Sequence, residues 1–308
     1  MPKTIIFDCD PGIDDALALL LAFYSKELDI RAVTVAGGNQ ELKETLNNAI
    51  GLLSFLGKQT AVAAGAPGPL LRPLVTAPEV HGNEGLAGRV LPGAFPPCEC
   101  SAVELMRRVT EESSTPVVII ATGPLTNIAA FLTAYPLLKS RIEYISLMGG
   151  ACFGGNQSPS AEFNIYVDPE AASAVFRAGV PIVMHGLDVT TRAFFTPADI
   201  EAIRGIGARV STLIADMLDY YMDFHHSIGL SVVNMHDLCA VAYVMQPSLF
   251  TTKDCHVEVE TKGELSRGCT VVDYKHMTGL PSNAKVAFEV DREAFVKLFI
   301  SAVQSFQQ

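Results

Sequence analysis

Tryptophan is absent from this chain of 308 residues, and basic side chains are scarce. Lysine and arginine number 22 against 33 aspartates and glutamates, which gives a formal net charge of −11. Proteins that bind nucleic acids or anionic membranes use clustered basic side chains to neutralise phosphates. The acidic balance therefore argues against a nucleic-acid or membrane partner, and it is compatible with small ligands and with a cation site.

The sequence also lacks the cysteine and hydrophobic patterns of secreted and membrane proteins. Its seven cysteines are scattered, odd in number and without a Cys-x-x-Cys pair, which is typical of reduced thiols. The longest apolar run, Ala16–Tyr24, has nine residues, whereas a bilayer span needs about 20. The apolar run near the N-terminus is too short for a signal peptide. We therefore expect a soluble, cytoplasmic protein.

Short β-rich runs alternate with longer helix-like stretches along the first two thirds of the chain. The predicted strands are Thr4–Phe7, Arg31–Val35, Ala61–Ala64, Val117–Ala121, Ile142–Met148 and Pro181–Met184. The predicted helices are Asp14–Tyr24, Glu41–Leu56, Ala102–Glu112, Leu125–Ala134 and Pro169–Ala178. Such alternation, with nearly continuous apolar strands, predicts an α/β fold with an open, mainly parallel sheet and helices on both faces.

The last third of the chain adds further helices and strands. Helices are predicted at about 208–225, 237–243 and 292–306, and strands at 256–261 and 269–272. The sequence shows no internal repeat, low-complexity tract or linker, and the Pro/Gly-rich stretches at 65–78 and 92–97 are typical of loops. We expect residues 1–308 to form a single domain with these elements as C-terminal additions.

Four carboxylates lie within eight residues directly after the first predicted strand, in Asp8-Cys9-Asp10-Pro11-Gly12-Ile13-Asp14-Asp15. One or two of them can cap the following helix, whose dipole favours negative charge there, but four exceed that need. A hard cation such as Ca²⁺ or Mg²⁺ would offset their repulsion, because carboxylate oxygens are its usual ligands. The alternative is a helix cap with solvated surface acids.

Polar, glycine-containing turns follow several other predicted strands. They are Gly37-Gly38-Asn39, the segment 122–127, Met148-Gly149-Gly150 and Gly186-Leu187-Asp188. Each alone is typical of a turn before a helix. Open α/β sheets bind ligands at the carboxyl ends of their strands, so together these turns predict a polar cleft with a cation at one end.

These motifs resemble the inosine-uridine nucleoside hydrolase family. The opening DCDPGIDDA is similar to that family's hallmark, and further matches follow in order along nearly the whole chain: VAGGN (35–39), VHGNEGL (80–86), ATGPLTNIA (121–129), LMGGA (147–151), NQSPSAEFNIYVDPEAA (156–172), GLDVT (186–190), MHDLCA (235–240) and TVVD (270–273). The resemblance implies that family's Rossmann-like fold and hydrolysis of the N-glycosidic bond of ribonucleosides to free base and ribose. It also implies a tightly held Ca²⁺ and a cytosolic homo-oligomer, a dimer or a tetramer.

The resemblance implies a role for each matched polar residue. Asp10, Asp15 and Asp237 would ligate Ca²⁺ through carboxylate oxygens, and Thr126 through its main-chain carbonyl. Asp10 would also take a proton from the attacking water. The matched residues that would hold the ribose are Asp14, Asn39, Met148, Asn156, Glu162, Asn164 and Asp237.

Two histidines inside matched motifs, His81 and His236, are candidates to assist departure of the base. His236 adjoins Asp237, so it must lie near the site. His81 lies in a loop bounded by proline and glycine, which is suited to closing over the base. His225 and His226 match no strong motif, and we assign them no role.

Base specificity depends on residues 223–233, where the motifs are weak. The pyrimidine-preferring relatives carry a glutamine and a tyrosine where this chain has Phe224 and Ile228, and the absence of tryptophan excludes the indole stacking of purine-specific relatives. Ile13 and the HDLCA and TVVD motifs are more similar to the broad-specificity branch. We expect hydrolysis of both purine and pyrimidine ribonucleosides, in nucleoside catabolism and salvage, with pyrimidine preference as the alternative.

Two readings from other classes stay open. Asp8-x-Asp10 has the spacing of haloacid dehalogenase-type phosphatases, although the threonine or valine that follows there is missing. A non-catalytic nucleoside- or ribose-binding protein on the same scaffold is the second. Every matched catalytic position, including Asp10, is intact, so the sequence favours the enzyme.

Overall fold

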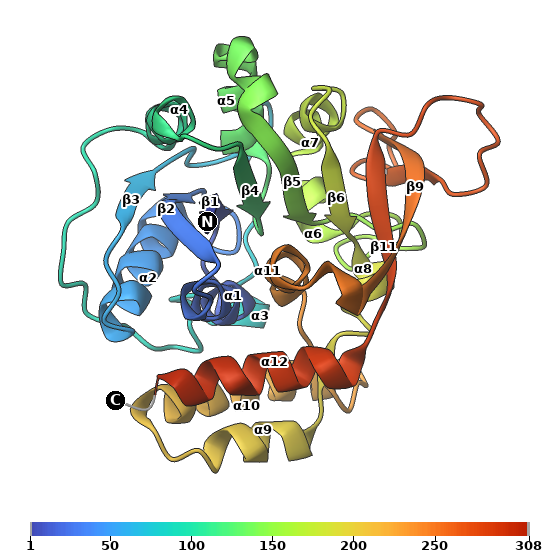
Figure 1. Cartoon of the computed structure of the whole chain (residues 1–308). Coiled ribbons are helices and arrows are strands. Elements are labelled where there is room, and N and C mark those ends of the chain that lie inside the picture. The colour runs from blue at the N-terminus through green and yellow to red at the C-terminus, as the bar shows by residue number, and fades with distance from the viewer. Residues whose placement is uncertain (1, 307–308) are drawn as a thin grey trace.

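The computed structural model describes residues 2–306. A nine-stranded sheet forms its centre, in the order β10-β9-β11-β6-β5-β4-β1-β2-β3 (Figure 1). The strands are β1 (Lys3–Cys9), β2 (Leu28–Val35), β3 (Ala61–Ala64), β4 (Val117–Ala121), β5 (Ile142–Met148), β6 (Ile182–His185), β9 (Phe250–Val259), β10 (Thr270–Asp273) and β11 (Ala284–Val290). All neighbours from β3 to β11 pair in parallel, and at the other edge β9 pairs antiparallel with both β11 and β10. The predicted mainly parallel α/β fold is confirmed.

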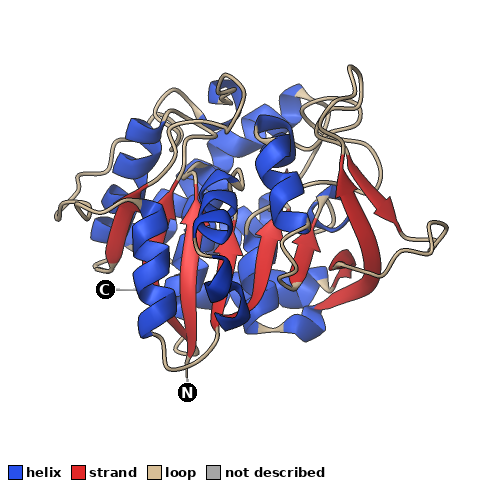
Figure 2. Cartoon of the chain, turned by 90° about the horizontal axis from the view of Figure 1, so that it is seen from above, coloured by secondary structure: helices blue, strands red, loops and turns tan. Residues whose placement is uncertain are grey.

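Helices pack against both faces of the sheet (Figure 2). One face is covered by α1 (Ile13–Tyr24), α2 (Leu42–Phe55), α10 (Arg209–Ser227), α11 (Leu238–Met245) and α12 (Arg292–Ser305), and the other by α4 (Ala102–Glu112), α5 (Thr126–Ala134) and α7 (Pro169–Phe176). Successive side chains of a strand point to opposite faces. Accordingly, β1 places Ile5 and Phe7 in one apolar cluster and Ile6 in the other.

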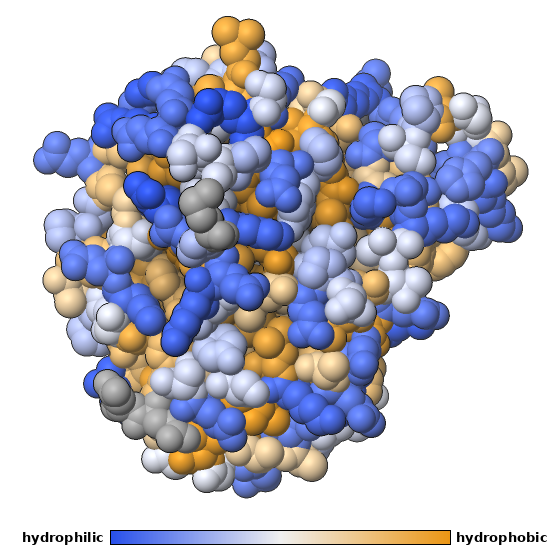
Figure 3. Space-filling model, viewed as in Figure 1, coloured by the Kyte–Doolittle hydropathy of each residue, from blue (hydrophilic) through white to orange (hydrophobic). Residues whose placement is uncertain are grey.

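Shorter elements complete the chain. They are α3 (Pro78–His81), α6 (Phe163–Val167), α8 (Leu187–Thr190), α9 (Pro197–Arg204), the 3₁₀ helices Pro136–Arg141 and Pro247–Leu249, and a separate antiparallel pair, β7 (Phe194–Phe195) with β8 (Val233–Asn234). Among residues 2–306, no helix combines the length and the hydrophobicity needed to cross a bilayer. Hydrophilic side chains are interspersed with hydrophobic ones across the face seen in Figure 3.

Strand β11 was absent from the sequence prediction. Its sequence AKVAFEV places Lys285 and Glu289 among apolar residues, so it lacks the continuous apolar run of a buried parallel strand. It nevertheless lies between β6 and β9, parallel to the first and antiparallel to the second. The C-terminal strands therefore extend the main sheet instead of forming a separate addition.

Candidate active site

Polar residues from distant segments meet at the carboxyl ends of the parallel strands. Asp10 follows β1, Asn39 follows β2, Thr122 follows β4, and Met148 ends β5. A cavity of about 490 Å³ lies here, lined by Asn39, Thr122 and Met148 among others. A larger hollow of about 760 Å³ lies at the opposite edge near Lys3 and contains none of these residues. The predicted polar cleft is therefore present at the expected edge of the sheet.

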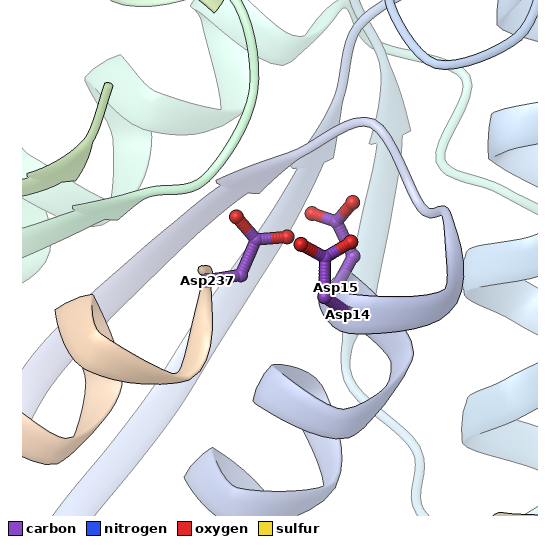
Figure 4. Close-up of side chains that lie close together, drawn as sticks. All are labelled: Asp14, Asp15 and Asp237. Atoms are coloured by element: carbon purple, nitrogen blue, oxygen red, sulfur yellow. The ribbon is translucent and has the colours of Figure 1, made fainter. Parts of the chain in front are cut away.

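Three buried aspartates converge beside this cavity. Asp14 and Asp15 belong to the first turn of α1, and Asp237 is the residue before α11. One carboxylate oxygen from each lies within 4.8 Å of the others (Figure 4). Burial raises the pKa of Asp14 to about 7, and burial and neighbouring carboxylates raise the pKa of Asp237 well above its ordinary range. A cation would reverse this repulsion, and oxygen ligands suit a hard one.

Asp10 is connected to this group through Asn39, which donates to both Asp10 and Asp15, and it is completely buried. Its Oδ2 accepts a hydrogen bond of 2.7 Å from the main-chain N–H of Asn39, whereas its Oδ1 has no hydrogen-bond partner within residues 2–306. A Cβ atom at Gly38 would stand 2.0 Å from Oδ2, and one at Gly123 2.4 Å from Oδ1. Glycine at both positions thus gives the carboxylate its room. A buried oxygen without a partner calls for a proton, a water or a cation.

The structure brings Asp15 and Asp237 together as predicted, but it places Asp14, and not Asp10, in the tightest group of three. Asp15 is held by donors from three segments. The Thr122 hydroxyl donates to Oδ1 at 2.7 Å, while the Gly12 amide and the Asn39 side chain donate to Oδ2 at 3.0 and 3.2 Å. Asn39 therefore connects Asp10 with Asp15.

Thr126 is positioned by a carboxylate that the sequence analysis did not single out. Its hydroxyl donates to Asp168 Oδ2 at 2.7 Å, and Asp168 also accepts hydrogen bonds from the amides of Leu70 and Ala171. Asp168 is completely buried. In the sequence, Asp168 followed by Pro169 indicates only a helix cap. Its bonds to Thr126 and Leu70 could not be predicted, because these two residues lie on distant segments.

Asp8 has a different place from the other three carboxylates of its motif. Its Oδ1 accepts hydrogen bonds from the Thr34 hydroxyl at 2.6 Å and the Asn127 side chain at 2.9 Å. Burial raises the pKa of Asp8 to about 7. These hydrogen bonds connect β1 with β2 and α5. Of the four carboxylates only Asp14 lines the cavity. Asp10 and Asp15 are both bonded to Asn39, which does line it, whereas the side-chain bonds of Asp8 go to Thr34 and Asn127.

The predicted ribose-binding residues lie along the same cavity. Glu162 caps α6, where it accepts hydrogen bonds from the amides of Asn164 at 3.0 Å and Gly150 at 2.9 Å, and burial raises its pKa to about 7. The Asn164 side chain donates to the Thr122 carbonyl at 2.8 Å. Asn156 is exposed and accepts a hydrogen bond from the Phe163 amide. These three residues and Met148 all line the cavity.

The two predicted histidines also line the cavity, and both are neutral near pH 7. His81 ends the short helix α3, and its Nδ1 accepts a hydrogen bond of 3.2 Å from the Ile13 amide. Its proton is therefore on Nε2. The His236 Nδ1 lies 2.8 Å from the Thr190 hydroxyl. Burial lowers the pKa of each to about 3, so each can donate a hydrogen bond but carries no positive charge.

His225, to which we assigned no role, forms hydrogen bonds with main-chain groups of two segments. Its Nδ1 donates to the Tyr221 carbonyl at 2.9 Å, and its Nε2 accepts from the Asn234 amide at 3.3 Å. It thereby joins α10 to β8, just before His236. His226 is exposed and does not line the cavity. Phe224 and Ile228 do line it, as part of an apolar wall.

Comparison with known proteins agrees with this geometry. The family model described as inosine-uridine preferring nucleoside hydrolase matches residues 5–297. The pyrimidine-specific ribonucleoside hydrolase RihA of Klebsiella pneumoniae is 49% identical over 302 residues, covering 97% of each chain, and that of Escherichia coli is 47% identical, covering 99% of this chain and all of the relative. A purine-preferring ribonucleoside hydrolase from Gardnerella vaginalis has a solved structure that superposes with a TM-score of 0.93, at 30% identity and 99% coverage of both chains. The chain belongs to the inosine-uridine preferring nucleoside hydrolase family.

Proposed function

We propose that this nucleoside hydrolase cleaves the N-glycosidic bond of pyrimidine ribonucleosides, giving ribose and the free base. The observation that carries the reaction is the group of buried carboxylates beside a cavity whose histidines are neutral. Membership of this family leaves the phosphatase alternative without support.

The preference for pyrimidines rests on the relatives. Those with 47–49% identity are named pyrimidine-specific, whereas the purine-preferring relative is 30% identical. The broad specificity expected from the sequence is not confirmed. That expectation depended on a few motif positions and on two residues of the cavity wall, Phe224 and Ile228. Similarity along nearly the whole chain is stronger evidence of specificity than these few positions.

The donor set fits Ca²⁺. Asp10, Asp15 and Asp237 would supply carboxylate oxygens and Thr126 its carbonyl, and the Asp10 oxygen without a partner is the observation that favours a cation here. Bound there, Ca²⁺ would orient ribose hydroxyls and acidify a water molecule.

The protein's own groups would then perform the remaining steps. Asp10, held through Oδ2 by Asn39, would take the water's proton. Asp14 would accept a hydrogen bond from the 2′-hydroxyl, and Asp237 one from the 3′-hydroxyl. The outer hydroxyls, including the 5′-hydroxyl, would be bound by Asn156, Glu162 and Asn164. Asn39 would hold the ribose near the reacting face, and Met148 would pack against the sugar.

Departure of the base would be assisted by neutral donors. The Nε2–H of His81 faces away from the Ile13 amide that occupies Nδ1. His236 would act in the same way with the Thr190 hydroxyl as the donor to its Nδ1. A hydrogen bond to the developing negative charge stabilises the transition state more than the ground state, which is the condition for faster turnover.

Release of reducing sugar from uridine, cytidine, inosine and adenosine tests the proposal, with Asp10→Asn as the inactive control. Release from the two pyrimidine nucleosides, and at least tenfold slower release from the purine nucleosides, is the expected result. Comparable release from all four would restore broad specificity. Binding without any release would favour the non-catalytic alternative.

We propose in addition that the chain acts as one domain in a cytoplasmic homo-oligomer, a dimer or a tetramer, and serves nucleoside catabolism. Light scattering coupled to size-exclusion chromatography measures the oligomeric state. A monomer at working concentration would contradict that part of the proposal.

A further inference from the structure

Tyr221 lies in the wall of the cavity and has no role in the mechanism described so far. It belongs to α10 and is 3% exposed. Its ring centre lies 5.9 Å from that of His81 and 4.6 Å from that of His225, and its plane is within 22° of the plane of Phe224. Aromatic neighbours on several sides therefore fix the orientation of the ring.

The hydroxyl of Tyr221 is the polar tip of this otherwise apolar wall. Within residues 2–306 the hydroxyl forms no side-chain hydrogen bond, yet it is not among the fully enclosed atoms that lack a partner, and the residue lines the cavity. A buried tyrosine hydroxyl normally has a partner. A water or ligand in the cavity would supply that partner.

Asp14, Asp237 and His81 line the same cavity as Tyr221, and the ring centre of His81 lies 5.9 Å from that of Tyr221. Burial raises the pKa of Tyr221, and the charges of Asp14, Asp237 and Asp15 raise it further. The hydroxyl is therefore protonated at neutral pH, because tyrosine ordinarily titrates near pH 10.

We propose that Tyr221 is a further catalytic residue, whose hydroxyl donates a hydrogen bond to the departing base beside the bond that breaks. The inference rests on the proposed function, in which Asp14 binds the 2′-hydroxyl. That hydroxyl is on the carbon next to C1′, so a donor near Asp14 is close to the pyrimidine O2 or the purine N3.

The chemistry balances without any further reactant. As the C1′–N bond breaks, its electron pair leaves with the base and spreads onto O2 or N3, while the water oxygen bonds to C1′ and its proton passes to Asp10. The Tyr221 proton stays on its oxygen throughout. A hydrogen bond to that developing charge strengthens as the bond lengthens.

Tyr221→Phe, which keeps the ring and removes only the hydroxyl, tests the proposal. The matched control is Tyr220→Phe, on the neighbouring residue, which is 38% exposed and does not line the cavity. Each variant is compared with wild type on uridine and on 4-nitrophenyl riboside, whose leaving group needs no hydrogen bond. For Tyr221→Phe we expect kcat/KM on uridine to fall about 10- to 100-fold, as for one hydrogen bond to a charged group, with less than a threefold change on the nitrophenyl substrate.

Three results would overturn the inference. Equal losses on both substrates would show that Tyr221 contacts the ribose or only supports the wall. A loss of less than threefold on uridine would show that the hydroxyl contributes nothing to base departure. Failure of the wild-type protein to cleave either substrate would overturn the proposed function and this inference with it.

Discussion

The hydroxyl of Thr126 donates a hydrogen bond of 2.7 Å to Asp168, a completely buried carboxylate 42 residues further along the chain. The same Asp168 oxygen accepts the Leu70 amide at 2.9 Å. The start of α5, the start of α7 and the loop around Leu70 are thereby joined at one point, next to the proposed metal ligand.

Thr126→Val should lower the free energy of unfolding by about 1–3 kcal/mol, because it removes a hydrogen bond to a buried carboxylate without changing the side-chain size. Denaturant unfolding measures the change. Thr133→Val, at an exposed position on the same helix, is the matched control and should change stability by less than about 0.5 kcal/mol. Equal effects of both variants would show that the contact with Asp168 is energetically unimportant.

Asp10→Asn should reduce kcat by about 10²–10⁴-fold, the usual contribution of a general base, while the protein stays folded. Stability should stay the same or rise, because burial raises the pKa of Asp10 well above its ordinary range and the amide carries no charge. Single-turnover kinetics and thermal unfolding check the two parts. Asp8→Asn is the control, since the Asp8 carboxylate is bonded to Thr34 and Asn127 and not to Asn39, and should retain activity within about tenfold of wild type. A larger loss for Asp8→Asn than for Asp10→Asn would refute the assignment of the base.

Ca²⁺ should raise the unfolding temperature of protein that has been stripped with a chelator. At a concentration 100 times the dissociation constant, binding to the folded state alone adds about 2.7 kcal/mol. Asp237→Asn should lose most of this stabilisation, because Asp237 is one of the three converging carboxylates. Differential scanning fluorimetry with Ca²⁺ and with Mg²⁺ measures the effect. An unfolding temperature that responds to neither ion would rule out the cation site.

His185 should make the protein less stable as the pH falls from about 6.5 to 4. Its Nδ1 donates to the Leu147 carbonyl, its Nε2 is buried without a partner within residues 2–306, and burial lowers its pKa to about 4. In the unfolded chain His185 titrates near pH 6.5, so as the pH falls the unfolded state takes up the proton before the folded state does. The contribution of neutral His185 to the free energy of unfolding is therefore fully present above pH 6.5 and is lost as the pH falls to about 4. Between pH 6.5 and pH 4, the free energy of unfolding of His185→Phe should therefore fall by about 3 kcal/mol less than that of wild type. Denaturant unfolding at each pH measures the two free energies. An equal fall in both proteins would contradict the expectation.

Local sequence patterns determined most of the secondary structure and the edge of the sheet on which the site lies. The bounds predicted for β3, β4, β5 and α4 agree with the structure to the residue, because each is a short apolar run or an amphipathic helix bounded by breaking residues. The placement of Asp10, Asn39 and Thr122 at one edge followed from the parallel order of the strands.

Only the tertiary structure decided which side chains meet. Lys285 and Glu289 obscured β11 in the sequence, and its place depends on pairing with two distant strands. Asp14 joins Asp15 and Asp237 because α1 packs against α11, while Asp8, in the same motif, turns to Thr34 and Asn127. A sequence pattern specifies the face on which a side chain lies, but hydrogen bonds between remote segments depend on packing, and that packing separates the structural carboxylates from those of the site.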